Sequence, residues 1–280
     1  MSETTLRRIW LCADDYGISP SVNAAIRDLV ARGRINATSV MAVSRSFSPS
    51  EASALAAAAA GRAAIGLHVT LTAPFRPLSA GFASVRDGAF LPLAAMAGRA
   101  LAHLLKAEDL EREIARQFAA FAAAFGRAPD YVDGHQHIHV FPQIRNIVLR
   151  VIDDVAPQAW LRQCGRAAAA HKSLADPKGF VLDALSARLR RLAARHGVRT
   201  NPAFAGTYSF APEADFARLF PGFLDGLPEG GLIMCHPGKI DAELRLLDPL
   251  TDLREREYAY FLDDAFPRLL AEHGVALAQA

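Results

Sequence analysis

The sequence predicts one parallel α/β domain in which seven or eight strand–helix units form a closed or nearly closed barrel. Apolar, β-prone runs alternate along the chain with helical segments, which is typical of a parallel sheet covered by helices. The chain has 280 residues, 51% of them hydrophobic, which suffices for one large core. With no internal repeat or linker, residues 1–280 are expected to form one catalytic domain with a loop or lid insertion at about 72–107.

Strands are expected where apolar residues run together over a short distance without helical spacing. The first of them ends at an expected turn, Asp14–Gly17. The expected strands are residues 8–13, 36–43, 63–71, 130–135, 159–164, 203–204, 231–235 and 275–277.

Helices are expected in the segments between these strands. Ser19 and Pro20 form a helix start signal, the alanine-rich segment after Pro49 has high helix propensity, and Gly126 is a typical helix end. The expected helices are residues 20–32, 49–61, 108–125, 143–154, 173–197, 212–224 and 254–272. Residues 72–93 combine Pro, Gly and Phe without periodicity, so we expect a loop or lid there.

Composition argues against several classes of protein. A net charge of +2 implies no strong attraction to nucleic acid or anionic membranes, and no apolar run is long enough to span a bilayer. The arginine-rich segment 188–199 lacks interleaved aromatics and is expected to be a solvated helix face. Three widely separated cysteines in apolar segments, together with a polar N-terminus unlike a signal peptide, predict buried thiols and a cytoplasmic protein.

Residues able to bind a metal or transfer a proton are concentrated just after the predicted strands. Five of the nine histidines fall there, whereas a folding requirement alone would scatter them. The carboxyl ends of barrel strands meet at one face, so these segments are expected to form one site. They are Asp14–Asp15, His68, Asp133–His139 and His236.

Asp14 and Asp15 follow an apolar strand directly, and adjacent buried carboxylates need a cation, a proton or several donors. The alternative is a turn or helix-capping aspartate. His68 lies in a strand pattern, where a metal ligand competes with a hydrogen-bonded core histidine. Arg162 either pairs with Asp14 and holds it ionised, or lies at the surface.

The run from Asp133 to His139 is the most specific signal. If it were extended, Asp133, His135, His137 and His139 would share one face at about 6–7 Å per step. That spacing is too wide for every imidazole to bind one ion, so one or two should be ligands. The others would orient ligands, bind substrate or cap the next helix. His236 before a Pro-Gly turn suits general acid or base chemistry, or is a packed turn residue.

Four segments resemble motifs of the YdjC-type carbohydrate deacetylases, a family that includes chito-oligosaccharide deacetylases and hopanoid-biosynthesis relatives. They are residues 13–19, 66–72, 133–139 and 234–237, in the family's order. The resemblance implies a distorted (β/α) barrel similar to polysaccharide deacetylases and one divalent ion, usually magnesium, with zinc, manganese or cobalt as alternatives. It further implies that Asp15, His68 and His135 are ligands, Asp14 the general base and His236 the acid.

The expected reaction is metal-dependent removal of an N-acetyl group from an amino sugar, either a chito-oligosaccharide or a related glycan or glycolipid. Gly134 and Gln136 replace the serine and histidine of some chitin-oligosaccharide members, so the glycan stays open. The alternatives are a metal-dependent phosphoesterase and a non-catalytic sugar-binding protein. The partner would be an acetylated amino sugar rather than nucleic acid, and the oligomeric state is open, a homodimer included. Three aromatics, Phe75, Phe82 and Phe90, either stack on sugar or pack the lid down.

Overall fold

A curled sheet of parallel strands organises the computed structural model, which describes residues 6–167 and 177–279. The sheet follows the order β7-β6-β3-β2-β1-β9-β8, and β10 pairs with the start of β1. Its strands are β1 (Arg7–Tyr16), β2 (Ala37–Val40), β3 (Ala64–Val69), β6 (Tyr131–Gly134), β7 (Trp160–Leu161), β8 (Phe204–Ala205), β9 (Leu232–Cys235) and β10 (Val275–Leu277). The predicted parallel α/β architecture is confirmed.

The two edges of the sheet approach each other without forming a continuous ladder. Two isolated parallel bridges, Leu161 with Thr200 and Arg166 with Phe204, connect the β7 side to the β8 side. The barrel is therefore curled and distorted rather than regularly closed, which agrees with the predicted fold class.

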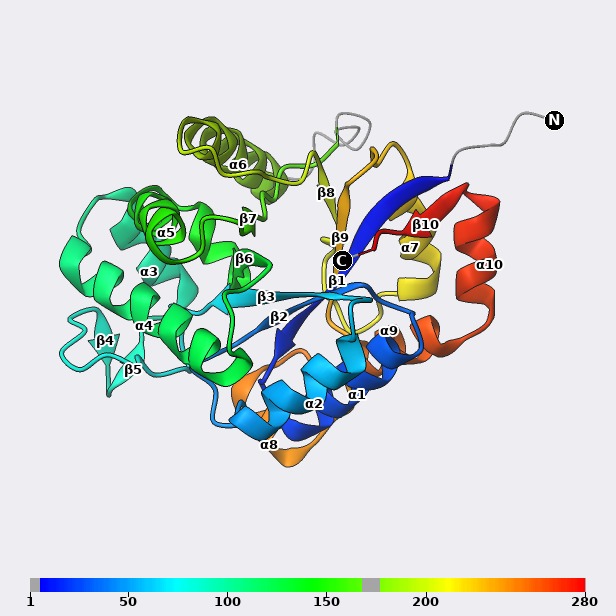
Figure 1. Ribbon diagram of the computed structural model, residues 1–280, viewed down its shortest axis with the longest axis horizontal. Coiled ribbons are helices and arrows are strands. Elements are labelled where there is room, and N and C mark those ends of the chain that lie inside the picture. The colour runs from blue at the N-terminus through cyan, green and yellow to red at the C-terminus, as the bar shows by residue number, and fades with distance from the viewer. Residues whose placement is uncertain (1–5, 168–176, 280) are drawn as a thin grey trace.

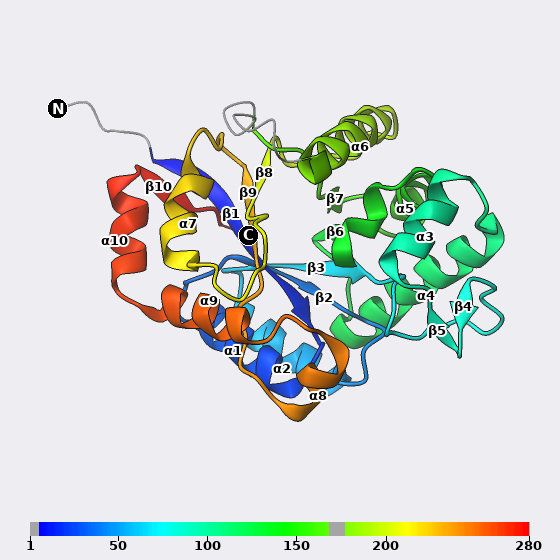
Figure 2. The same ribbon diagram turned by 180° about the vertical axis from the view of Figure 1, so that it is seen from behind.

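Helices surround the outside of the curled sheet (Figures 1 and 2). Helices α1 and α2 lie together along one side, while α5 packs on both α3 and α4 at another side. The helices are α1 (Pro20–Ala31), α2 (Pro49–Ala59), α3 (Leu93–Leu101), α4 (Ala107–Phe125), α5 (Pro142–Val155), α6 (Pro177–Arg195), α7 (Phe216–Leu224), α8 (Ala242–Leu247), α9 (Asp252–Leu262) and α10 (Ala265–Glu272). The predicted start of α6 at Ser173 lies outside the described residues.

Several predicted boundaries are wrong for local reasons. Strand β1 continues to Tyr16, because the backbone carbonyl of Tyr16 still accepts a hydrogen bond from Met41, so the turn begins at Gly17. Strand β2 ends at Val40 rather than at residue 43. Helix α7 begins only at Phe216, because the Asp215 carboxylate caps it by accepting from the backbone N–H of Arg218 at 3.2 Å.

The predicted helix over residues 254–272 is two helices. Asp263 has an extended backbone, which ends α9, and α10 begins separately after Asp264. Helix α8 was not predicted. The segment expected to be irregular contains a hairpin of β4 (Val85–Arg86) and β5 (Ala89–Phe90), and α3 follows it.

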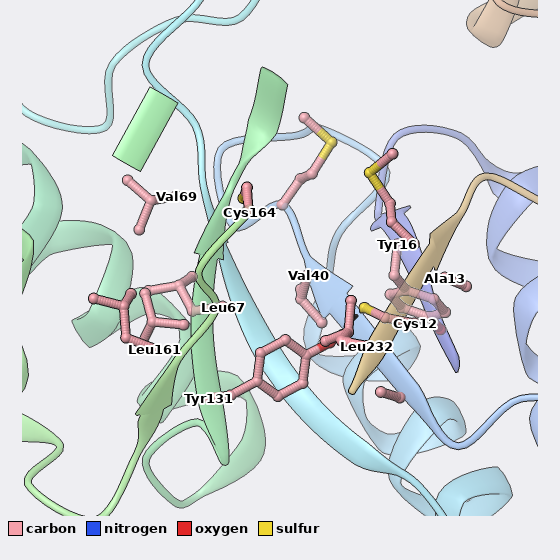
Figure 3. Close-up of a cluster of buried hydrophobic side chains, with 14 of the residues drawn as sticks. Cys12, Ala13, Tyr16, Val40, Leu67, Val69, Tyr131, Leu161, Cys164 and Leu232 are labelled. Carbon is pink, nitrogen blue, oxygen red and sulfur yellow. Dashed lines mark hydrogen bonds between the residues drawn. The ribbon is translucent and has the colours of Figure 1, made fainter. Parts of the chain in front are cut away.

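The barrel interior is filled by side chains from neighbouring strands. Figure 3 shows Cys12 and Tyr131 in this buried cluster, and the Cys12 thiol lies 3.0 Å from the Tyr131 hydroxyl. A side chain at Gly66 would collide with Tyr131, because an added Cβ would lie 2.5 Å from the tyrosine ring. Tyr131 also stacks on Trp160 with ring centroids 4.3 Å apart. This packing fills the interior below the carboxyl ends of the strands and leaves the site above them.

All three cysteines are free and buried, as the sequence predicts. Among the described residues, the longest helices fall short of the length and apolar character that crossing a membrane requires.

Candidate functional site

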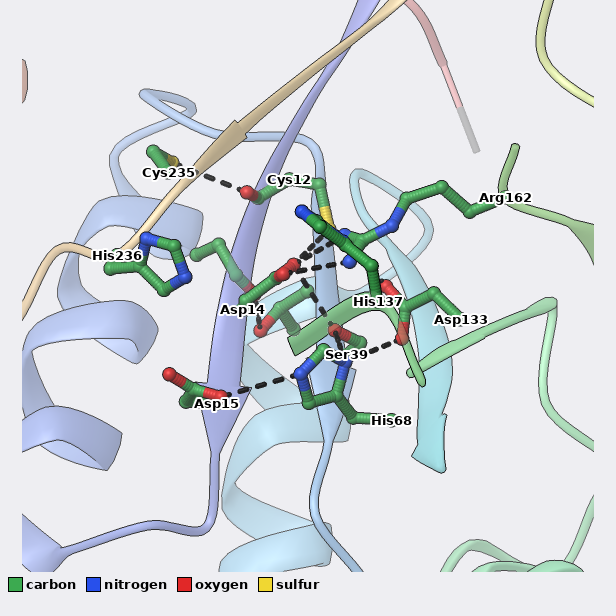
Figure 4. Close-up of polar contacts among 12 residues, drawn as sticks. Cys12, Asp14, Asp15, Ser39, His68, Asp133, His137, Arg162, Cys235 and His236 are labelled. Carbon is green, nitrogen blue, oxygen red and sulfur yellow. Dashed lines mark hydrogen bonds and ion pairs between the residues drawn. The ribbon is translucent and has the colours of Figure 1, made fainter. Parts of the chain in front are cut away.

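The four predicted segments meet at the carboxyl ends of β1, β3, β6 and β9 (Figure 4). They line a cavity of about 790 Å³, which is large enough for a small oligosaccharide unit. Part of its apolar wall comes from Leu182 and Leu185 of α6 and from the ring of Phe210. The cavity residues predicted from the sequence are Asp14, Asp15, His68, His135, His137 and His236.

Asp14 and Asp15 both reach the site although adjacent strand residues normally point to opposite faces. The register of β1 against β2 shifts between Ala13 and Tyr16, and Asp15 adopts a positive φ of 69°. Such a bulge redirects a side chain and is common beside functional sites. It brings both carboxylates to the same cavity.

Asp15, His68 and His135 form the first of two clusters whose ligand atoms all lie within 4.8 Å of one another. The Oδ1 atom of Asp15 lies 3.0 Å from His135 Nδ1 and 3.3 Å from His68 Nε2. The Nε2 atom of His68 is buried and, within the described part of the chain, has no hydrogen-bond partner of good geometry. A carboxylate with two imidazoles is a suitable donor set for a divalent cation.

His68 is oriented by a second carboxylate. Its Nδ1 lies 2.6 Å from Asp133 Oδ1 and 3.0 Å from Ser39 Oγ, so Nδ1–H donates and the lone pair of neutral His68 is at Nε2. This carboxylate–histidine pairing is the arrangement that typically fixes a metal-binding imidazole. The residues present therefore fit a divalent ion at Nε2.

Charge around His68 is strongly negative. Burial alone would lower the pKa of His68, but the carboxylates of Asp133 and Asp14 outweigh burial and raise that pKa to about 10. A divalent cation at Nε2 would displace the proton, so ion binding is expected to release protons.

The second oxygen of Asp15 is held by an arginine. Arg254, which is fully buried, donates from Nη2 to Asp15 Oδ2 at 2.6 Å and also contacts Asp248. Burial would raise the pKa of Asp15, but Arg254 and His135 hold it well below its usual range. Asp15 is therefore ionised, with Oδ1 turned toward the imidazoles.

Asp14 has a different partner. The guanidinium of Arg162 donates to both its oxygens, at 2.6 and 2.8 Å, and also lies 2.8 Å from Asp133. Burial alone would raise the pKa of Asp14, but Arg162 and His68 lower it below its usual range. The pairing of Arg162 with Asp14 that the sequence suggests is present, and the alternative of a surface arginine is wrong because Arg162 is fully buried.

The second cluster able to hold a metal consists of Cys12, Asp14 and Asp133. Arg162 already supplies its positive charge, since its Nη1 contacts both carboxylates. Burial also raises the pKa of the Cys12 thiol well above its usual value, which disfavours the thiolate that a metal needs. This cluster is a buried ion-pair network rather than a second metal site.

The histidine run is not extended. Residues His135–Val140 form a short 3₁₀ helix in which Gln136 and His137 have positive φ, so the expectation of four side chains on one face is wrong. His139 turns inward and its Nε2 donates to the backbone carbonyl of Arg162 at 2.8 Å. His137 lines the cavity and packs edge-on against Phe204. Among these residues, only His135 joins Asp15 and His68.

His236 lies on the β9 side of Asp14 and Asp15, across from His68 and Arg162 (Figure 4). Its backbone N–H donates to Glu257 Oε2 at 2.5 Å, while its Nδ1 is buried without a partner among the described residues. Burial lowers the pKa of His236 and Arg254 lowers it further, although Asp15 opposes them. His236 is thus neutral near pH 7.

The aromatics of the predicted lid are buried rather than presented to the cavity. Phe82 and Phe90 pack on each other, and Phe75 contacts the ring of His135 edge-on at 5.6 Å. Glu113 of α4 anchors the same segment by accepting from the backbone N–H groups of Leu78 and Ser79. These rings therefore pack the segment down.

Four residues near the site were not predicted from the sequence: Ser39, Asp248, Arg254 and Glu257. Arg254 and Glu257 occur in the charged run Asp252–Glu257, which is indistinguishable in sequence from a solvated helix face. No local signal distinguishes their buried positions.

A family model for YdjC-like proteins matches residues 8–272. The chain belongs to this family. The four motifs that suggest it in the sequence all lie within the matched region, so the predicted resemblance is confirmed. A chitooligosaccharide deacetylase of Serratia marcescens is 29% identical over 239 residues, covering 83% of this chain and 82% of the relative. A chitooligosaccharide deacetylase of Klebsiella pneumoniae is 29% identical over 237 residues, covering 82% and 81%.

Solved structures share the fold. A protein of Enterococcus faecalis V583, described as a cellobiose-phosphate cleavage protein, matches with a TM-score of 0.73 at 23% identity, over 98% of this chain and 97% of that chain. A CE4 esterase of Streptococcus mutans matches with a TM-score of 0.52 at 11% identity, over 98% and 86%. Both matches span the whole barrel of this YdjC-like chain.

Proposed function

We propose that this YdjC-like protein is a metal-dependent carbohydrate N-deacetylase that removes the acetyl group from an acetylated amino sugar. The observation that carries the proposal is the different environment of two adjacent aspartates. Asp15 lies with two imidazoles, while Asp14 is paired with Arg162 at the same cavity. Family relatives are chitooligosaccharide deacetylases, and this division of carboxylates suits hydrolysis of an amide.

In this proposal Asp15, His68 and His135 would hold the ion, which when bound would supply the Lewis acidity needed to activate water and polarise the acetyl carbonyl. Asp14 accepts the proton of the attacking water. Because Arg162 and His68 lower the pKa of Asp14, this carboxylate is ionised and ready to accept a proton, although it is a weak base. Arg162 also keeps Asp14 in one orientation at the cavity.

His236 delivers a proton to the leaving amine. Since its lowered pKa leaves it neutral at rest, His236 must first gain a proton, and the proton collected by Asp14 is the available one. His137 lines the cavity and is proposed to contact substrate, whereas His139 and Asp133 hold Arg162 and His68 in place.

The metal is proposed to be magnesium from the family resemblance. The two imidazoles of the donor set suit zinc, manganese or cobalt better, so reconstitution with each ion should be compared. We further propose a cytoplasmic location, because three buried free thiols suit a reducing compartment. We propose that residues 72–107 form an insertion that borders the cavity through Leu93. The oligomeric state is a separate question, and light scattering would test for a homodimer.

An acetate-release screen tests the proposal. Metal-free protein is reconstituted with magnesium, zinc, manganese or cobalt and offered N-acetylglucosamine, its dimer and longer oligomers. We expect acetate release that chelator abolishes and that His68→Ala lacks. Phosphate release from sugar phosphates without acetate release would instead support a phosphoesterase, and saturable binding without any product would support a sugar-binding protein.

The phosphoesterase alternative is disfavoured by the structure. Phosphate-transferring metal sites commonly use two ions, and both carboxylates of the second cluster of potential ligands in the described residues are already paired with Arg162.

A further inference from the structure

Helix α9 places two charged side chains in the protein interior. Its buried residues are Leu253, Arg254, Glu257 and Phe261, and Arg254 and Glu257 are both 0% exposed. Charged side chains are almost never fully buried unless they are paired. Both side chains therefore need polar partners, and both contact residues of the candidate site.

Arg254 contacts the ligand side of the site. Its Nη2 atom donates to Asp15 Oδ2 at 2.6 Å, and the same nitrogen contacts Asp248. Its Nε donates to the backbone carbonyl of Leu250 at 3.0 Å, so the guanidinium is fixed from two directions. With Oδ2 engaged by Arg254, the other oxygen of Asp15, Oδ1, faces His68 and His135.

Glu257, one turn later, contacts the opposite side of the site. One carboxylate oxygen accepts from the Tyr208 hydroxyl at 2.6 Å, and the other accepts from the backbone N–H of His236 at 2.5 Å. Tyr208 and His236 both line the cavity. Tyr208 also packs on Phe210, whose ring contacts that of His236. Glu257 thus joins a cavity wall to the proposed proton donor.

We propose that the buried face of α9 is the positioning element of the site, in which Arg254 fixes the ligand oxygen of Asp15 and Glu257 fixes His236 and Tyr208. The assignment rests on the proposed deacetylase function. Arg254 and Glu257 are positioning residues, because each acts through another residue. Neither residue belongs to the four motifs in which the sequence resembles its family.

Substitutions of Arg254 and Glu257 should have different effects, one on metal affinity and the other on turnover. Outer partners of metal ligands are typically worth about 10- to 100-fold in metal affinity. Arg254→Lys is therefore expected to weaken Mn²⁺ binding at least about tenfold in calorimetry, because a lysine cannot reproduce the fork that reaches Asp15, Asp248 and Leu250. Glu257→Gln is expected to leave Mn²⁺ affinity within about twofold while lowering kcat/KM about tenfold or more. An amide cannot accept from both Tyr208 and His236 as the carboxylate does.

The exposed face of the same helix offers matched controls, Glu255→Gln and Arg256→Lys. Both are expected to match the wild type in Mn²⁺ affinity and turnover. The proposal is overturned if Arg254→Lys and Glu257→Gln behave like these controls, or if they lower the melting temperature while Mn²⁺ affinity and kinetics per folded molecule stay unchanged.

Two readouts keep this test separate from the deacetylase proposal. If the wild type releases no acetate, the Mn²⁺ affinity of Arg254→Lys still tests the ligand side. The NMR signals of the His236 ring test the other side, since Glu257→Gln should move them and Glu255→Gln should not. Unmoved signals in Glu257→Gln would overturn the assignment of Glu257 whatever the substrate.

Discussion

Replacing Asp14 with asparagine tests the proposed base without removing a proposed ligand. The variant keeps the shape of the side chain but loses the charge that accepts a proton. General base catalysis is typically worth about 10²–10⁴-fold, so kcat should fall by that factor. Mn²⁺ affinity should stay near the wild-type value, because Asp14 lies outside the cluster of Asp15, His68 and His135.

The structural cost of Asp14→Asn is limited by the remaining partner of Arg162. The guanidinium loses part of its two-point contact with residue 14 but keeps Asp133, whose Oδ2 lies 2.8 Å away. Weakening a charge-assisted hydrogen bond costs about 1.5–3 kcal/mol, which is less than the stability of about 5–15 kcal/mol typical of a folded protein. The variant should therefore fold and bind metal, so its activity can be interpreted.

The adjacent aspartate supplies the control. Acetate release and Mn²⁺ calorimetry are measured for the wild type, Asp14→Asn and Asp15→Asn under the same conditions. Asp15→Asn should lose both metal affinity and activity, whereas Asp14→Asn should lose activity alone. Turnover of metal-loaded Asp14→Asn within a few-fold of the wild type would refute the assignment of Asp14 and leave neutral His236 as the base.

Three other changes have defined outcomes. Metal at a hundredfold excess over Kd should stabilise the wild type by about 2.7 kcal/mol and raise its melting temperature. His68→Ala should abolish this rise, and an unchanged rise in melting temperature would exclude His68 as a ligand. Burial raises the pKa of Glu257 from 4.5 to about 7, so the native state binds the extra proton and the free energy of unfolding should fall by up to about 3 kcal/mol as pH rises through this window. Denaturant titrations of Glu257→Gln at several pH values should lack this pH dependence of the free energy of unfolding. The same pH dependence in Glu257→Gln and the wild type would show that Glu257 is not its source. Gly206→Ala should destabilise the protein by at least about 2 kcal/mol, because its Cβ would lie 2.1 Å from the Met234 carbonyl, while Gly230→Ala, also at positive φ but without a close contact, should cost less.

The barrel could be predicted because its strands are continuous apolar runs. Strands buried on both faces leave a simple compositional signal, and β1, β3 and β9 were all located from it. The boundaries that failed depend on single residues. The Asp215 carboxylate caps a backbone N–H and so decides where α7 begins, while the extended backbone of Asp263 separates α9 from α10. An aspartate in such a segment shows neither role in the sequence.

The ligand cluster could be predicted, and its supporting residues could not. Asp15, His68 and His135 are unusual residue types at strand ends, which sets them apart from their neighbours. Arg254 and Glu257 belong instead to an ordinary charged helix, and their burial depends on how α9 packs against α1 and α7, more than 200 residues from Asp15 along the chain. Pairing over such a distance requires the tertiary structure.

Both Asp14 and Asp15 reach the same cavity, although they are adjacent residues of one strand. In a regular strand one of them would face the helices, and the site would contain a single carboxylate. The shifted register after Ala13 and the positive φ of Asp15 allow both to face the cavity. Two buried anions side by side are costly unless each has its own cation. Arg162 meets that need for Asp14 and Arg254 for Asp15. Since Arg162 engages both oxygens of Asp14 and Arg254 engages only Oδ2 of Asp15, Oδ1 of Asp15 is the oxygen left to face the imidazoles and an ion. The two arginines thus explain how neighbouring, chemically identical residues acquire the different environments on which their proposed roles rest.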